Sequence, residues 1–387
     1  MMNRVTEYLN VNAYFDYSLT ILPGSEAGIP RALYNFETTR ATAIPIPAEV
    51  LSIYSRFRPT RLFRARHFEK ALGTNCEIFI KDESTTPTGN HKANSAYLIA
   101  YLCGREGIRE LTTETTGNWG VALAIAARDF GMRSTSFLDE VSNRQRPGTR
   151  RAIESRGGKV VIVKLDDRHH DLLKLSADAA IGATRMRHDA AYVFGSVYGY
   201  FVIPQSIMGV EAHHQLAAIG KYPDVVVGSC GGGANLLGIA APFLIEKLAV
   251  GREVSIVSAE SENCPILSTS RLGYYSVDSL GYYPALHTYG LDGLSDAEYI
   301  GGLGSTIVAS AAAHFHHLGL IRATVMTSRH AQEAAGIFQR TEGIRVALET
   351  AYQLAAVADE SRRMDNGVIL ANISSGENDA EFYNLIE

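Results

Sequence analysis

Short apolar runs alternate with segments of helical periodicity along most of this chain. The apolar runs that predict buried strands are 77–81, 111–113, 134–138, 159–163, 225–228, 254–258 and 368–371. Apolar residues at helical spacing predict helices at 93–103, 118–130, 148–156, 235–248, 331–340 and 349–359. Because strand and helix signals alternate, the pattern predicts an α/β protein built on parallel sheet.

Lys92 lies where one predicted strand gives way to a predicted helix. Pro87 and Gly89 break the chain between the two, so Lys92 stands near the helix N-terminus. There the helix dipole and the free backbone N–H groups favour the neutral amine and attract a phosphate. A neutral lysine can form a Schiff base with a carbonyl cofactor. The alternative is an ordinary solvated lysine at a helix start.

Two further segments place small or polar residues directly after a buried strand. A run of three glycines at 231–233 follows the strand at 225–228 and precedes an apolar helix. Without side chains, successive N–H groups can form a nest for a phosphate, although a flexible turn is the alternative. Ser374 and Ser375 follow the strand at 368–371, and hydroxyls at a strand's carboxyl end face the crevice where open α/β sheets bind ligands.

Together these segments resemble the fold-type II pyridoxal-phosphate (PLP) enzymes, and within them the tryptophan synthase β-subunit branch, particularly its second type. The resemblance runs from about Arg58 to Ser375. His91, directly before the lysine, is typical of that branch, and 112–124 is similar to its Glu-Thr-Gly-Ala-Gly-Gln-(His/Trp)-Gly loop. The match is completed by segments at 194–197, 205–211 and 340–344.

The resemblance implies an α/β fold of two open, twisted, mostly parallel sheets flanked by helices. It implies a larger PLP-binding lobe formed by residues 1–94 and 201–387, and a smaller mobile lobe formed by 95–200. A homodimer is expected. The expected partners are a small amino-acid substrate and a nucleophile.

The resemblance also assigns roles around the cofactor. Lys92 carries PLP and, once the substrate has displaced it, removes the α-proton of the amino acid. The phosphate is assigned to His91, Gly231, Gly232, Gly233, Ala234 and Asn235. Asn94 is placed at the phenolic oxygen, Glu342 near the ring, and Ser375 or Ser374 at the pyridine nitrogen, with Ser375 preferred. A serine stabilises a protonated pyridine less than a carboxylate does, which favours loss of a β-substituent over transamination.

The expected reaction type depends mainly on Glu114. In the β-subunit the matching glutamate assists the leaving group and the incoming nucleophile, and a carboxylate beside an apolar pocket has the raised pKa that this requires. The alternative is a carboxylate stabilised by a helix dipole. The loop that follows is expected to hold the substrate carboxylate through Thr115, Thr116, Gly117 and Asn118.

Departures from the β-subunit pattern leave the product open. The Glu114 loop is one residue shorter than that pattern and is closer to the Ser-Gly-Asn loop of threonine and cysteine synthases, and the segment 164–194 is also short. The sequence therefore predicts β-replacement on an L-serine-like donor through an aminoacrylate, without assuming tryptophan as product. The alternatives are a β-elimination lyase or dehydratase, and a catalytically silent PLP-binding or regulatory subunit.

Composition is compatible with this interpretation. The chain has 387 residues and a formal net charge of -5, which gives no reason to expect nucleic acid. No apolar run reaches the roughly 18 residues of a membrane helix, and the N-terminus lacks a signal-peptide core. The four cysteines show neither metal spacing nor a disulfide framework, so we expect no metal site and a reducing cytoplasm. The need for a monovalent cation is left open.

Overall fold

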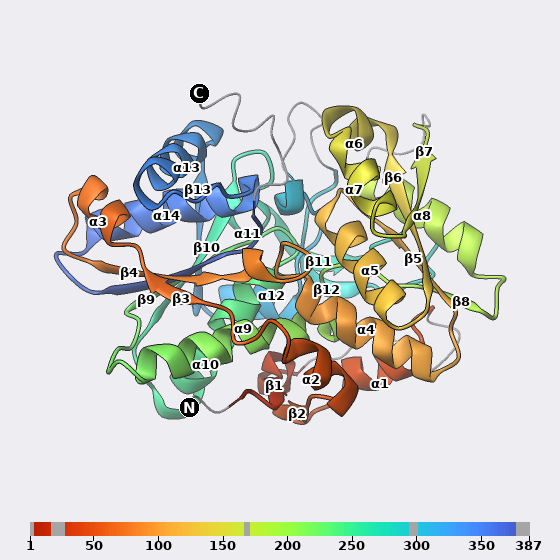
Figure 1. Ribbon diagram of the computed structural model, residues 1–387, viewed down its shortest axis with the longest axis horizontal. Helices are drawn as coiled ribbons and strands as arrows, with labels where there is room; N and C mark the ends of the chain where they lie inside the picture. The colour runs from red at the N-terminus through yellow and green to blue at the C-terminus, as the bar shows by residue number, and fades with distance from the viewer. Residues whose placement is uncertain (1–3, 17–27, 166–170, 294–300, 377–387) are drawn as a thin grey trace.

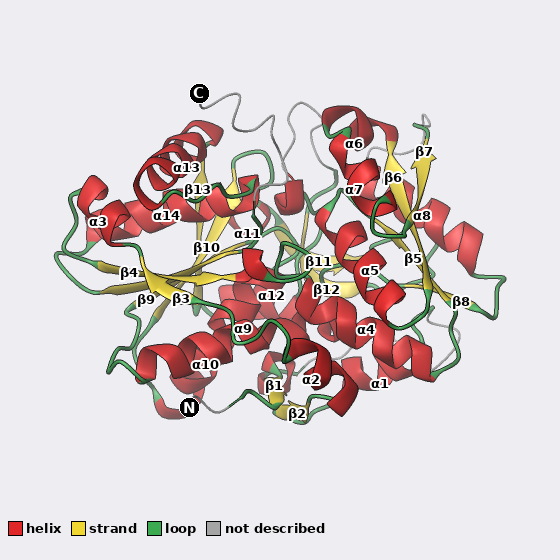
Figure 2. Ribbon diagram, in the orientation of Figure 1, coloured by secondary structure: helices red, strands yellow, loops and turns green. Residues whose placement is uncertain are grey.

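The computed structural model describes residues 4–16, 28–165, 171–293 and 301–376. Within them, a six-stranded sheet and a four-stranded sheet lie side by side, the former on the left of Figure 1 and the latter on the right. Helices cover both sheets (Figure 2). The α/β class and the mostly parallel sheets predicted from the sequence are confirmed.

The six-stranded sheet has the order β13-β10-β9-β14-β4-β3, and only the β3–β4 pair is antiparallel. Its strands are β3 (Leu62–Arg64), β4 (Glu77–Asp82), β9 (Val225–Ser229), β10 (Ser255–Ser261), β13 (Ile321–Met326) and β14 (Val368–Ile373). The helices packed on it are α3 (Arg66–Leu72), α9 (Gly199–Ala217), α10 (Ala234–Val250), α13 (Ser328–Glu342) and α14 (Leu348–Arg363). Along β9, Val225 and Val227 join the core under α13 and α14, while Val226 joins the core with α9 and α10, so both faces are buried.

The four-stranded sheet is parallel throughout and has the order β7-β6-β5-β8. Its strands are β5 (Glu110–Glu114), β6 (Arg133–Asp139), β7 (Lys159–Val163) and β8 (Ala190–Tyr192). The helices of this part are α4 (Ala93–Arg105), α5 (Asn118–Asp129), α6 (Glu140–Gln145), α7 (Gly148–Glu154) and α8 (Leu172–Thr184). This sheet lies within residues 95–200, and the division of the chain into two lobes at the expected boundaries stays a prediction.

Smaller elements complete the described chain. They are β1 (Glu7–Leu9), η1 (Val11–Tyr14), α1 (Arg31–Thr38), β2 (Ala43–Pro45), α2 (Ala48–Tyr54), η3 (Glu83–Thr85), α11 (Ile266–Thr269), β11 (Arg271–Tyr275), β12 (Leu286–Gly290), η4 (Gly301–Leu303) and α12 (Ser310–His317). β1 pairs with β2, and β11 pairs with β12, each antiparallel.

Candidate active site

Lys92 stands at the N-terminus of α4, in a segment held against the end of β14. The Lys92 N–H donates to the side-chain oxygen of Asn90 at 3.0 Å, and the His91 N–H donates to the Ser374 carbonyl at 2.8 Å. The Lys92 amine itself donates to the Gly195 carbonyl at 3.4 Å. These bonds bring the lysine between the end of β14 and the segment that follows β8.

Burial changes the chemistry of this amine. It lowers the pKa of Lys92 from an ordinary 10.5 to about 8, because a charged ammonium is poorly solvated there. The Glu349 and Glu114 carboxylates act in the opposite direction by stabilising the charged form. Compared with an exposed lysine, a much larger fraction of the amine is neutral near neutral pH and able to attack a carbonyl.

The glycine loop, residues Gly231 to Asn235, lines a cavity beside Lys92. It connects β9 to α10, whose N-cap is Gly233 with φ 87°, and no side chain caps this helix. Backbone N–H groups are therefore the donors available along this wall, an arrangement that attracts an anion. At Gly232, a Cβ would lie 2.5 Å from the hydroxyl oxygen of Ser196, so the packing favours glycine.

A buried amide network fixes the last residue of the glycine loop. The Asn235 amide nitrogen donates to the Ser229 hydroxyl at 2.6 Å, and its oxygen accepts from Asn372 at 2.7 Å. Gln353 on α14 donates to the Asn372 oxygen at 2.8 Å. Ala234, Asn235 and Ser229 also line the Lys92 cavity. The network ties the start of α10 to β14 and α14.

Ser374 and Ser375 both line the Lys92 cavity from the end of β14. The Ser374 hydroxyl shares a hydrogen bond with the Thr350 hydroxyl at 3.0 Å, whereas the Ser375 hydroxyl donates to the carbonyls of Gly376 at 3.2 Å or Gly89 at 3.5 Å. Which of the two serines meets a pyridine nitrogen stays a prediction.

Glu114, the last residue of β5, lines a second cavity together with Lys92. Its Oε2 accepts from the Tyr192 hydroxyl at 2.5 Å and faces the Thr113 hydroxyl at 3.3 Å, while Oε1 accepts from the Gly195 N–H at 3.4 Å. Burial raises the pKa of Glu114 from 4.5 to about 7, although the hydrogen bonds and the Lys92 charge act against this rise. Such a carboxyl exchanges a proton readily near neutral pH.

The expected carboxylate loop leads from β5 into α5. The Thr115 hydroxyl accepts from the Gly117 N–H at 3.0 Å and from the Gly120 N–H at 2.9 Å, which closes the turn. Thr115 and Thr116 line the Glu114 cavity, and Asn118 lines the Lys92 cavity. Gly117 has φ 151° and faces a wider cavity that it shares with Asn118. The loop thus contacts the cavities of both reactive groups.

Comparison with known proteins agrees with this geometry. A family model described as pyridoxal-phosphate dependent enzyme matches residues 53–375. The chain is 35% identical over 367 residues to tryptophan synthase beta chain 2 of Aquifex aeolicus, covering 89% of this chain and 85% of the relative. It is 34% identical over 350 residues to tryptophan synthase beta chain of Fervidobacterium nodosum, covering 87% and 84%. Against tryptophan synthase beta chain 2 of Thermotoga maritima the identity is 33% over 349 residues, covering 86% and 82%.

The chain belongs to the tryptophan synthase β family of PLP-dependent enzymes. The family, the fold type and the cofactor expected from the sequence are therefore confirmed. The residues present fit PLP: the buried amine of Lys92 would hold its aldehyde, the N–H groups at the start of α10 would hold its phosphate, and hydroxyls lie at the end of β14. The contact that each residue makes with the cofactor stays a prediction.

His91 and Asn94 occupy different surroundings in this PLP enzyme. His91 lines the Lys92 cavity, and its Nδ1 lies 2.8 Å from the Gln205 oxygen. Burial lowers the pKa of His91 to about 4, so its ring is neutral near pH 7. Asn94 donates to Glu83 at 3.0 Å and accepts from Arg58, and it lines neither the Lys92 cavity nor the Glu114 cavity.

Glu342 also lies away from the two cavities. Its carboxylate accepts from the Phe68 N–H at 2.8 Å near the end of α13. Glu349, at the start of α14, lines the Lys92 cavity instead, and it accepts from the Gly302 N–H at 2.6 Å and from Asn118 at 3.3 Å. Sequence reasoning missed Glu349; the signal that could have found it is an acidic residue in the first turn of a predicted helix.

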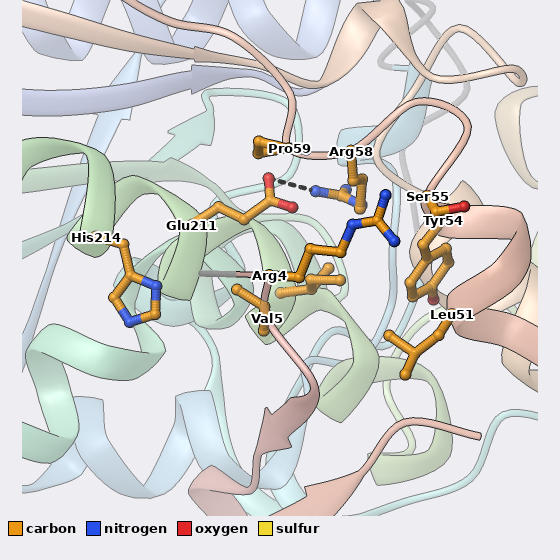
Figure 3. Close-up of a pocket in the computed structure, with 10 residues that line it drawn as sticks. Arg4, Val5, Leu51, Tyr54, Ser55, Arg58, Pro59, Glu211 and His214 are labelled. Carbon is orange, nitrogen blue, oxygen red and sulfur yellow. Dashed lines mark hydrogen bonds and ion pairs between the residues drawn. The ribbon is translucent and has the colours of Figure 1, made fainter. Parts of the chain in front are cut away.

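A separate cavity of about 440 Å³ shares no lining residue with those of Lys92 and Glu114 (Figure 3). Arg4 and Arg58 both line this cavity, and Arg58 bonds Glu211 at 2.8 Å, the dashed line in Figure 3. Arg58 also pairs with Glu83 at 2.5 Å, and Lys81 pairs with Glu211 at 2.7 Å. We call these four buried residues, Arg58, Lys81, Glu83 and Glu211, the Arg58 cluster.

Two features are absent from the part of the chain that the structure describes. No helix there is long and apolar enough to cross a membrane. Among the same residues, no group of three or more His, Cys, Asp or Glu side chains is arranged to hold a metal ion.

Proposed function

We propose that this enzyme catalyses β-replacement on an L-serine-like amino acid. The donor loses a substituent from its β-carbon, and a nucleophile takes its place to give a β-substituted amino acid. The observation that carries the proposal is that Lys92 and Glu114 line one cavity, with the amine pKa lowered to about 8 and the carboxyl pKa raised to about 7. The two groups can divide the proton transfers at the α- and β-carbons between them.

Lys92 would act at the α-carbon. When bound, PLP withdraws electrons from that carbon and makes its proton removable. Once the substrate amine has replaced it on the cofactor, the free Lys92 amine is the base that accepts the α-proton. The same group returns the proton after the nucleophile has added. Its lowered pKa supports this role, because a much larger fraction of the amine is then unprotonated near neutral pH than in an ordinary lysine.

Glu114 would act at the β-carbon. In its protonated form it gives a proton to the leaving group as the bond to the β-carbon breaks. The resulting carboxylate then accepts a proton from the nucleophile as the new bond forms, so the carboxyl is restored at the end of the cycle. A pKa of about 7 makes both forms accessible.

Deuterium exchange at the donor Cα, combined with product analysis, tests the proposal with the holoenzyme. We expect wild-type enzyme to exchange the α-proton and to form a new amino acid only when a nucleophile is supplied. Glu114→Gln should keep the exchange but lose about 10²-fold or more in product formation, the scale of general acid-base catalysis. Glu342→Gln is the matched control, because Glu342 lies outside both cavities.

Two outcomes would contradict β-replacement. Wild-type enzyme that releases only keto acid and ammonia with every nucleophile tried would be an elimination lyase. Absence of α-proton exchange with every amino acid tried would indicate a silent PLP-binding subunit.

A further inference from the structure

The two oxygens of the Glu114 carboxylate have different surroundings. Oε2 accepts from the Tyr192 hydroxyl at 2.5 Å and also faces the Thr113 hydroxyl at 3.3 Å. Oε1 has one longer contact, from the Gly195 N–H at 3.4 Å. A carboxylate oxygen exchanges a proton more easily when fewer donors hold it. Oε1 is therefore the oxygen that is better placed to exchange a proton with the substrate.

Tyr192 is itself held rigidly. It is 1% exposed at the end of β8, and its ring packs edge-on against Tyr283 with 5.1 Å between centroids. The Tyr283 hydroxyl donates to the Tyr192 carbonyl at 2.7 Å, and the Tyr283 N–H donates to Asp278 at 2.9 Å. The segment between β11 and β12 thus supports the tyrosine that contacts Glu114.

We propose that Tyr192 is a positioning residue for Glu114, holding Oε2 so that Oε1 alone exchanges protons at the substrate β-carbon. The inference rests on the proposed function, since it assigns the orientation of the acid-base group. Tyr192 does not itself touch the reacting atoms; it acts through the carboxyl.

The proposal has a consequence for the titration of Glu114. Within the described residues, the charge of Glu114 interacts with the Lys92 amine and with the ionised forms of Tyr192, Tyr198 and Tyr283. Of the three tyrosines, Tyr192 is the one whose hydroxyl donates a hydrogen bond to this carboxyl. Burial raises the pKa of Tyr192 well above its ordinary value, so its hydroxyl stays a donor. A donated hydrogen bond stabilises the carboxylate and lowers the Glu114 pKa. Its removal should therefore move the Glu114 pKa upward from about 7.

Tyr192→Phe tests this in the holoenzyme, because it removes the hydroxyl and keeps the ring. We expect kcat for product formation to fall by between about 10-fold and 100-fold, with the donor KM little changed, as expected for a misplaced catalytic group. The midpoint of the pH profile that depends on Glu114 should move to higher pH. Tyr198→Phe is the matched control, because its hydroxyl donates to the Pro284 carbonyl at 2.8 Å and forms no bond with Glu114.

Direct titration of the carboxyl separates this inference from the proposed function. Infrared difference spectra of each enzyme against its Glu114→Gln form follow the protonation of Glu114 without turnover. An upward shift in Tyr192→Phe but not in Tyr198→Phe supports the positioning role, even if no nucleophile yields a product. Tyr283→Phe, which loosens Tyr192 through its carbonyl, should shift the midpoint in the same direction by less. Unchanged titration in Tyr192→Phe, or equal shifts in Tyr192→Phe and Tyr198→Phe, would overturn the inference.

Discussion

Among single residues, Lys92 and Glu114 show how burial alone brings the pKa of a base and the pKa of an acid closer together. Burial disfavours the charge on each, so the amine pKa falls from 10.5 to about 8 while the carboxyl pKa rises from 4.5 to about 7. In water the two groups titrate about six units apart. In the cavity both can gain or lose a proton near neutral pH at small energetic cost.

The lowered lysine pKa predicts how cofactor loading depends on pH. Only the neutral amine attacks the PLP aldehyde, so the rate of PLP uptake by cofactor-free protein should rise with pH around a midpoint near 8, well below the ordinary 10.5. Stopped-flow absorbance measures this rate. A midpoint near 10 would contradict the prediction. Lys92→Ala should lose the borohydride-trapped PLP adduct, whereas the exposed Lys70→Ala should keep it.

The candidate residues found from the sequence were those whose backbone position alone indicates a role. Lys92 and the glycine loop stand next to predicted strand and helix ends, and the structure places them at one cavity. The backbone positions of Glu342 and Glu349 do not show which of the two side chains reaches the Lys92 cavity. Both flank a turn between two helices, and only the direction of the side chain shows that Glu349 reaches the cavity.

Among the elements, the glycine loop is the one whose backbone carries the expected ligand contact. We expect Gly232→Asp to prevent PLP retention, because it adds a negative charge where the phosphate needs bare N–H groups. Dialysis followed by absorbance measures the retained cofactor. Gly232→Ala adds the same Cβ without charge and should retain more PLP. Gly182→Asp on α8, where a Cβ meets nothing within 4 Å, is the control. A folded Gly232→Asp enzyme with full PLP occupancy would reject the role of the loop.

Several elements with a clear hydrophobic pattern were predicted close to their observed bounds, whereas helix α9 was not predicted. The predicted run 159–163 coincides with β7, and the predicted helix 93–103 lies within α4. Helix α9 was missed: most of its residues are buried, so it shows no polar face, and it contains the helix-breaking Pro204. Helix α10 is equally enclosed and contains Pro242, but it was predicted at 235–248, where an apolar run directly follows the three glycines.

At the scale of the whole molecule, the Arg58 cluster connects distant parts of the chain. Arg58 lies before β3, Glu83 follows β4, and Glu211 is on α9. Arg58 also donates to Asn94, which donates to Gln205 at 3.3 Å. The cluster therefore stabilises the junction between the six-stranded sheet and the start of α4.

Removing the buried guanidinium should destabilise the enzyme strongly. Arg58→Ala leaves the buried carboxylates of Glu83 and Glu211 without their guanidinium partner, and breaking such a buried arrangement costs about 3–5 kcal/mol of unfolding free energy. Denaturant unfolding of the holoenzyme measures the loss. Arg329→Ala, which breaks an exposed ion pair with Glu333, should leave stability unchanged. Equal stability of the two variants would show that the Arg58 cluster does not hold this junction.

The position of β14 has a consequence for synthesis of the protein. This strand, Val368–Ile373, lies between β9 and β4 in the middle of the six-stranded sheet. On the ribosome, the sheet cannot close until the segment that ends at Ile373 has left the exit tunnel, although β4 and β9 emerge much earlier. Nascent chains therefore expose unpaired edges of these two strands, which are sites for chaperone binding or aggregation. Because Ser374 and Ser375 come later still, the complete Lys92 cavity forms only after nearly all of the described chain has been translated.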